Sequence, residues 1–208
     1  YRIYSLLTEM GFRVRLALIT YRDISGREDE VSRLAFLIES EEALAERLGG
    51  AMIEVGQADP SAFVPWQAGL MYLFQFLIGN TDWSIVESHN TKILQVGPEY
   101  YPVPFDFDFS GLVDAQYAGP NPLMSRYITS VRERFFRGIC SPDIDYAALI
   151  AHFNQSRQAI LDLIEGQPGM SEWNRHQALT YVESFYENIA NERDAANFFA
   201  NACRGVGG

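Results

Sequence analysis

An almost wholly apolar stretch, PWQAGLMYLFQFLI at residues 65–78, constrains the fold of this chain more than any other segment. A helix that is hydrophobic all round has no face to present to water, so it belongs at the centre of a core. Pro65 suits the first helical turn, where its missing N–H leaves no hydrogen bond unmade. The apolar run ends at Gly79, well short of the roughly 20 residues that cross a bilayer. We therefore expect a buried helix and no membrane span.

Composition narrows the classes of partner. A chain of 208 residues with 48% hydrophobic content can bury a sizeable core. Its formal charge of −11 and its pI near 4.7 argue against general nucleic-acid binding, which needs a basic face. An anionic ligand would need a metal ion or a local basic patch to offset this charge.

Two further features concern the chain ends and the cysteines. The sequence begins at Tyr1 within a helical pattern, so we expect that the natural N-terminus is missing, and the sequence assigns no compartment. Cys140 and Cys203 lack the spacing of metal ligands. They are compatible with one disulfide or two thiols, and we expect two thiols.

The order of predicted elements gives an α+β fold. Residues 1–9 carry a helix-like apolar face, and the alternating segments 12–21 and 32–39 predict an antiparallel hairpin. A serine before residues 41–48 and two glycines after them predict a short helix, which a loop joins to the central helix. Further along we expect strands at 91–96 and 101–109 around the turn at Gly97 and Pro98, then helices at 126–137, 144–165, 171–190 and 193–203.

The segment VPFDFDFSG at 103–111 sets two acids among aromatic residues. If it is a strand, Asp106 and Asp108 project to one face and the phenylalanines to the other. Two carboxylates in one small volume favour a cation between them, and Mg²⁺ typically takes one or two carboxylates plus phosphate oxygens and water. The alternative is an edge strand whose acids face solvent.

A second polar cluster, GNTDWSIVESHN at 79–90, follows the central helix. Asp82 could accept a proton from a hydroxyl substrate, and Asn90 could give a metal ion a neutral oxygen ligand. Lys92 or His89 could offset phosphate charge. The alternative is that these residues only turn the chain after a helix.

The order of these parts matches a kinase catalytic loop followed by a metal-binding loop. The motifs IGNTDWS, HN and VPFDFDFSG resemble the atypical protein-kinase-like fold of the CotH spore-coat kinases and the HipA-type kinases. By this resemblance residues 1–40 would be the remnant of an N-lobe, from the end of helix C through a hairpin. Residues 41–208 would be a mostly helical C-lobe with the catalytic and metal-binding loops.

The resemblance implies a phosphotransferase that uses ATP and Mg²⁺ on an unidentified hydroxyl acceptor, either a protein or a small molecule. It makes Asp82 the catalytic aspartate, Asn90 and Asp106 metal ligands, and Asp108 a second acid near the metal. The segment from Phe36 to Ser40 would face the adenine. Its implied nucleotide contacts are Phe36, Ile38 and Glu39, with Lys92 near the phosphates.

Two departures from that family pattern stand out. Kinases usually place the asparagine about five residues after the catalytic aspartate, whereas Asn90 follows Asp82 by eight. Glu87 stands at the five-residue offset and could substitute as a carboxylate ligand. The chain also begins after the place where a glycine-rich loop and a strand-borne lysine would lie. We therefore expect it to be inactive alone.

Two other functions fit the same motifs. Asp106-Phe107-Asp108 could be the Asp-x-Asp motif of a glycosyltransferase, although that class usually places alternating strands and helices before it. A pseudokinase that keeps the fold without chemistry is the third reading. The remaining basic cluster, Arg132, Arg134 and Arg137, is expected on one face of a helix in solvent or paired with acids.

Overall fold

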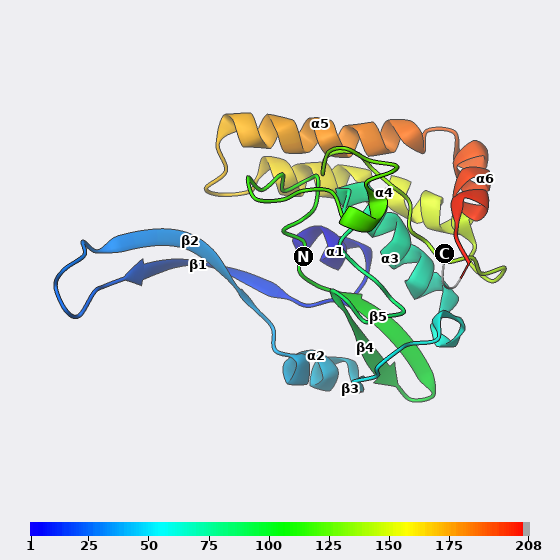
Figure 1. The fold of residues 1–208 in the computed structure, drawn as a ribbon, viewed down its shortest axis with the longest axis horizontal. Coiled ribbons are helices and arrows are strands. Elements are labelled where there is room, and N and C mark those ends of the chain that lie inside the picture. The colour runs from blue at the N-terminus through cyan, green and yellow to red at the C-terminus, as the bar shows by residue number, and fades with distance from the viewer. Residues whose placement is uncertain (206–208) are drawn as a thin grey trace.

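The computed structural model describes residues 1–205. Over that range the chain forms six α-helices and two small antiparallel sheets, which confirms the α+β class (Figure 1). Among the same residues no helix combines the length and apolarity that crossing a membrane requires. The last three residues, 206–208, lie outside the described part.

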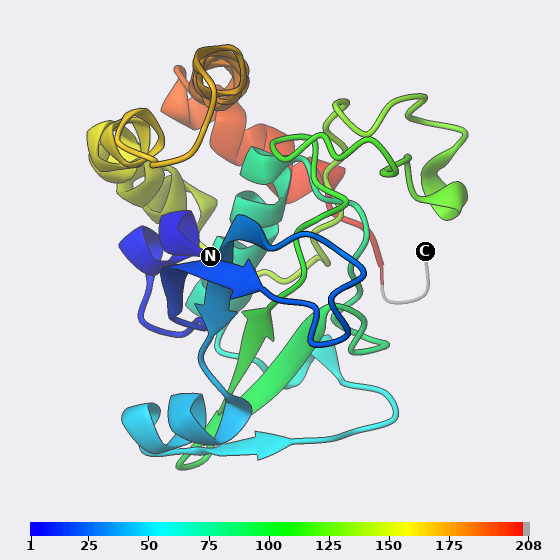
Figure 2. The same ribbon diagram turned by 90° about the vertical axis from the view of Figure 1, so that its left-hand side faces the viewer.

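Helix α3 (Pro65–Ile78) forms the centre of the core, as its apolar sequence predicts. Its residues 67–78 are all buried, and Gly79 ends the helix in the left-handed conformation with φ of 65°. Figure 2 shows α3 between the small sheet below and the C-terminal helices above. The loop that leaves α3 is therefore held by the most buried element of the molecule.

The first sheet is a hairpin of β1 (Val14–Tyr21) and β2 (Val31–Ile38), which follows α1 (Arg2–Leu7). The strands pair in register, with Val14 opposite Ile38, and the hairpin projects from the body of the molecule (Figure 1). In the middle of β2, Leu34 lies against Gly169 in the turn after α4. Several apolar side chains of the hairpin stay exposed, and Leu18 is 71% exposed.

The second sheet has the order β3 (Ala51–Ile53), β4 (Thr91–Val96) and β5 (Glu99–Pro104). Two of the three strands were predicted, and β3 was not, because its three residues are too short to show an alternating pattern. Helix α2 (Glu41–Leu48) precedes β3 and has both predicted caps, Ser40 and Gly49. Prolines occur in β5, the edge strand, where a missing N–H leaves no ladder bond broken. Single 3-10 turns lie at Pro60–Ala62 (η1) and Pro122–Met124 (η2).

The C-terminal third packs three helices on α3. They are α4 (Tyr146–Glu165), α5 (Glu172–Asn188) and α6 (Glu192–Ala202), each within two residues of the predicted bounds. Side-chain caps begin all three, from Asp145, Ser171 and Asn191. Their aromatic residues meet Phe76 of α3, with Phe185 and Phe199 at ring-centroid distances of 6.2 and 5.3 Å.

The helix predicted at 126–137 is wrong, because this segment is a series of turns. The carboxylate of Glu133 accepts hydrogen bonds from Thr129 and from the Ser130 N–H, which closes a local turn in place of a helix. Arg132 pairs with the acid Asp114 at 3.1 Å, as expected, but the other two arginines are not solvated. Arg134 and Arg137 turn inward and donate to backbone carbonyls.

The expectation of two thiols is also wrong. A disulfide joins Cys140 to Cys203, which lie 63 residues apart in the sequence. The pairing depends on how the segment after residue 137 crosses the end of α6, which no local pattern reveals. Beside the disulfide, Ile139 and Arg204 form a parallel bridge, so the C-terminal segment is attached to the body twice.

Candidate functional site

The two acidic loops meet at the C-terminal end of α3. The Gly111 N–H donates to the Gly79 carbonyl at 3.1 Å, and Asn80 and Ser110 form an antiparallel bridge. Asp82 lies two residues after Asn80, and Asp108 lies two residues before Ser110. Antiparallel pairing therefore brings the two predicted acid motifs to one place in the molecule.

Asp82 and Asn90 are brought together by a closed turn. Ser84 and His89 exchange both backbone hydrogen bonds at 2.9 Å, so the residues between them loop out. The Asn90 side-chain amide donates to the backbone carbonyl of Asp82 at 2.7 Å and to its Oδ2 at 3.1 Å. His89 Nε2 lies 3.2 Å from Asp82 Oδ1. The eight-residue spacing thus places the aspartate and asparagine side by side.

The strand predicted through residue 109 ends at Pro104, so the expectation that strand alternation aligns Asp106 and Asp108 is wrong. Asp106 has φ of 54°, which a strand does not allow. The last ladder-like bond runs from the Phe105 N–H to the Asn90 carbonyl at 3.0 Å. This bond places Asp106 next to Asn90, and a loop conformation, not a strand face, brings the acids together.

The acids repel one another. The pKa of the Asp106 carboxyl is raised because it is partly removed from water, and because negative charge on Asp108, and also on Asp82, lies nearby. Tyr117 donates its hydroxyl to Asp108 Oδ2 at 3.1 Å, and this bond to a carboxylate raises the tyrosine pKa. The cluster therefore carries excess negative charge.

Phe107 anchors the loop that carries the acids. Its ring is buried, with centroid distances of 4.8 Å to Tyr1 and 5.4 Å to Phe74 of α3. The Tyr1 hydroxyl accepts a hydrogen bond from the Asp106 N–H at 3.0 Å. The buried ring of Phe107 thus fixes the loop in the core, and its neighbours Asp106 and Asp108 stay at the surface.

The side-chain oxygen atoms at this site are of the type that binds a hard divalent cation. Asp106, Asp108 and the side-chain oxygen of Asn90 are oxygen ligands of the kind Mg²⁺ prefers, and the excess charge favours a cation. Within residues 1–205 no group of three or more Asp, Glu, His or Cys side chains is close enough to form a metal site by itself. A cation here would complete its coordination with water or substrate oxygens.

The residues predicted to contact the nucleotide do not form one cluster as the acids do. Lys92 Nζ pairs with Glu41 at 2.9 Å and lies 5.6 Å above the Phe105 ring. The Glu39 carboxylate is held by Arg47 at 2.8 Å, and this hydrogen bond is the main reason its pKa is lowered. The side chains of Lys92 and Glu39 are thus engaged with other protein groups.

Phe36 and Ile38 are half-exposed on the hairpin. Phe36 lines an apolar groove of about 430 Å³ between the hairpin, α1 and the α4–α5 turn, and its ring lies 5.6 Å from that of Tyr1. Because Tyr1 also contacts Phe107, this groove is adjacent to the acidic loop. The substitute ligand Glu87 instead lines a separate pocket of about 220 Å³ with Arg137 and Arg204.

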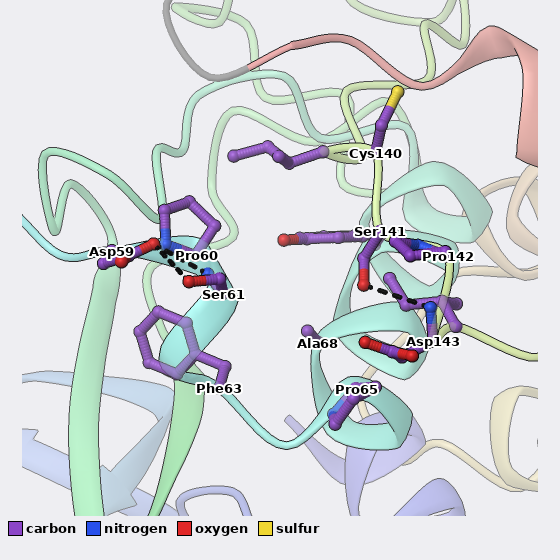
Figure 3. Close-up of a pocket in the computed structure, with 13 residues that line it drawn as sticks. Asp59, Pro60, Ser61, Phe63, Pro65, Ala68, Cys140, Ser141, Pro142 and Asp143 are labelled. Carbon is purple, nitrogen blue, oxygen red and sulfur yellow. Dashed lines mark hydrogen bonds between the residues drawn. The ribbon is translucent and has the colours of Figure 1, made fainter.

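A further cavity of about 180 Å³ lies between η1, the start of α3 and residues 139–144 (Figure 3). On one wall Asp59 accepts from both the N–H and hydroxyl of Ser61. On the other wall the Asp143 N–H donates to the Ser141 hydroxyl. None of the predicted site residues lines this cavity, so the chemistry suggested by the sequence lies elsewhere.

Sequence reasoning missed three contributors to the site. Tyr1 accepts a hydrogen bond from Asp106, 105 residues away in the sequence, and Tyr117 donates one to Asp108, nine residues away. Arg137 donates to the Thr81 carbonyl next to Asp82, 56 residues away in the sequence. Only Tyr117 lies near its partner in the sequence, in a loop rich in glycine and proline where no pattern marks it.

Comparisons with known proteins give no match. No protein-family model, no curated protein and no solved structure matches this chain.

Proposed function

We propose that this chain is part of an atypical kinase-like phosphotransferase that moves the γ-phosphoryl group of ATP to a hydroxyl acceptor with Mg²⁺. The observation that carries the proposal is the Asp82–Asn90 pair beside the Asp106–Asp108 pair at the end of a buried helix. In the proposed arrangement residues 1–40 belong to an N-lobe and residues 41–208 to a C-lobe.

Each residue has a defined part in this proposal. The Asp82 side chain is 31% exposed, so a substrate hydroxyl can reach it and be oriented for attack. The Asn90 amide nitrogen holds the Asp82 carboxylate, which leaves the Asn90 oxygen as a neutral ligand. Asp106 and Asp108 supply the negative ligands. When bound, Mg²⁺ would neutralise phosphate charge.

The net charge of the site supports a cation-dependent reaction. A chain with a formal charge of −11 repels a nucleotide triphosphate, and Asp106 lies among other acids. Phosphoryl transfer asks the protein mainly for positioning and charge neutralisation. A few acids fixed on a rigid helix end can meet that demand. The apolar groove beside Phe36 is the proposed location of the adenine.

The glycosyltransferase alternative has less support. That reading expects a parallel nucleotide-binding sheet before the Asp-x-Asp motif, whereas the sheets of the described chain are antiparallel. The pseudokinase alternative shares the fold of the main proposal and differs only in turnover.

The test combines binding with turnover. Thermal shifts are measured with ATP and with nucleotide sugars, each with Mg²⁺ or Mn²⁺, both for this chain and for the chain that carries an added N-lobe, and phosphate release and transfer from labelled ATP are measured for the latter. We expect stabilisation by ATP with Mg²⁺, turnover lost in Asp82→Asn, and metal-dependent binding lost in Asp106→Asn/Asp108→Asn. Full turnover in Asp82→Asn would contradict the assignment. ATP binding without turnover in the wild-type chain, also when it carries an added N-lobe, would favour the pseudokinase.

A further inference from the structure

Arg137 is a buried cation directly behind Asp82. Its side chain is 5% exposed, and Nη1 donates to the backbone carbonyls of Thr81 and of Trp83, the latter at 2.6 Å. These are the two residues on either side of Asp82. The guanidinium also lies 5.5 Å from the Trp83 ring centroid.

Burying the Arg137 guanidinium costs free energy, so its position calls for an explanation. In the part of the chain that the structure describes, Arg137 forms no ion pair, and its Nε has no hydrogen-bond partner. Burial, and then the nearby charge of Arg204, lowers the Arg137 pKa to about 10, although the charges of Asp82 and Glu87 act in the opposite direction. A buried charge with no carboxylate in direct contact is expensive to keep. Peptide carbonyls from one short loop offset part of this cost.

The contacts restrict the geometry of Asp82. Arg137 holds the carbonyls of the residues before and after Asp82, and Asn90 holds the carbonyl of Asp82 itself, so the carboxylate retains little freedom beyond its own side-chain torsions. Those torsions are restrained by His89 and Asn90 from the other side. Asn121 adds a hydrogen bond to the Thr81 carbonyl at 3.1 Å. The loop is therefore fixed from behind while its carboxylate stays accessible.

Arg137 is itself held by the C-terminal segment. The Arg204 N–H donates to the Gly138 carbonyl and the Cys140 N–H donates to the Arg204 carbonyl, both at 3.0 Å. The disulfide from Cys140 to Cys203 fixes the same two segments covalently. A residue three positions before this disulfide thus connects the end of α6 to the loop of Asp82.

We propose that Arg137 is a positioning residue for Asp82, acting through the carbonyls of Thr81 and Trp83. This inference rests on the proposed function for its effect on turnover, but its effect on loop geometry stands independently. A displacement of about 1 Å at a reacting group is enough to lower a rate about 100-fold. Arg137 therefore supports the rate of the chemical step more than the binding of nucleotide.

Arg134 offers a matched control. It lies three residues earlier, is partly buried, and also donates to backbone carbonyls, but to those of Leu77 and Tyr181. Its guanidinium lies 3.8 Å from the Tyr181 ring centroid. Arg134→Met and Arg137→Met therefore remove the same chemistry from the same segment, and only one of them touches the loop of Asp82.

Amide hydrogen exchange of residues 80–91 is compared in the wild type and both variants, after correction for the global stability of each. We expect faster exchange in this loop for Arg137→Met and no local change for Arg134→Met. Equal loop exchange in the two variants would overturn the inference, whether or not the chain is a kinase. If Arg137→Met does not fold, Arg137→Lys is compared in its place, because the lysine side chain is one bond shorter and its nitrogen stops short of the position from which Nη1 donates to both carbonyls.

Turnover gives the second readout. In a chain that transfers phosphate, Arg137→Met is expected to lower kcat about 100-fold with the KM for ATP unchanged. Unchanged kcat with altered loop exchange would also contradict the positioning role. Absence of transfer in the wild-type chain that carries an added N-lobe would count against the proposed function alone, since the exchange comparison would still decide whether Arg137 holds the loop.

Discussion

The Asn90 side-chain amide donates to both the backbone carbonyl and the carboxylate of Asp82, at 2.7 and 3.1 Å. One side chain thus sets the position and the orientation of the predicted catalytic acid. The same asparagine has φ of 49°, a left-handed conformation that asparagine adopts more readily than most residues. Backbone conformation and side-chain chemistry therefore both favour asparagine at this position.

Replacing Asn90 by glycine and by alanine separates these two contributions. Both changes remove the amide, so we expect both to weaken Mg²⁺-dependent nucleotide binding and to lower turnover. Alanine also strains the left-handed backbone, which costs about 1 kcal/mol more than glycine. Chemical denaturation checks the stability difference. Equal stability of the two variants would contradict the strain argument, and unchanged metal dependence would remove Asn90 from the site.

Asp106→Asn should stabilise the protein in metal-free buffer at neutral pH. The folded-state pKa of Asp106 is raised, so between the ordinary pKa and the raised one the folded protein holds a proton that the unfolded chain has lost. Stability therefore falls as the pH rises through that window, and the neutral amide removes this loss. We expect a gain of about 0.5 kcal/mol after solvent screening.

Thermal unfolding with EDTA, from pH 4 to pH 7, tests this expectation. The gain should be absent at the acidic end and present at the neutral end. Added Mg²⁺ with ATP should stabilise the wild type and not the variant. A variant that is less stable than wild type at neutral pH without metal would show that the Asp106 charge is compensated in the folded protein.

Phe107→Ala should destabilise the chain by about 3 kcal/mol, as expected for a large buried aromatic ring. Phe109→Ala is the matched control from the same loop. Phe109 is partly exposed and lies 5.9 Å from the Tyr117 ring centroid, so its loss should cost about 1 kcal/mol. Denaturant unfolding measures both. Similar losses for the two variants would contradict the anchoring role of Phe107.

Removal of the disulfide should lower stability substantially. A cross-link that closes 63 residues restricts the unfolded chain by about 4 kcal/mol in the chain-entropy description. We expect Cys140→Ser/Cys203→Ser to show this loss, and dithiothreitol to produce it in the wild type, because Cys140 is exposed. Unfolding with and without reductant measures the effect. A wild type insensitive to reductant would indicate that the two thiols are not joined.

The sequence predicted those elements whose signals are local. Residues 65–78, 41–48 and 91–96 form elements with the predicted bounds, because apolar runs, caps and turns act within a few residues. Residues 126–137 lack the predicted helix because contacts from distant segments decide their structure. Arg134, for example, is bonded to carbonyls 47 and 57 residues away.

The same distinction applies to the site. The acids were found because two of them stand two residues apart in an unusual aromatic setting. Their actual conformation depends on a left-handed residue at Asp106 and on the bridge between Asn80 and Ser110, which lie 30 residues apart. The Arg137 contact and the disulfide were missed for the same reason. Whether Phe36, Ile38, Glu39 and Lys92 contact a nucleotide stays a prediction.

Helix α3 has a consequence for how this chain can vary between species. Its residues from Gln67 to Ile78 are all buried, and Gly69 has so little room that an added Cβ would lie 2.6 Å from both Ile144 and Leu149. Substitutions that enlarge or polarise such positions would be selected against. Among relatives of this chain, α3 should therefore drift slowly along its whole length, whereas the exposed turn that joins β1 to β2 can diverge quickly.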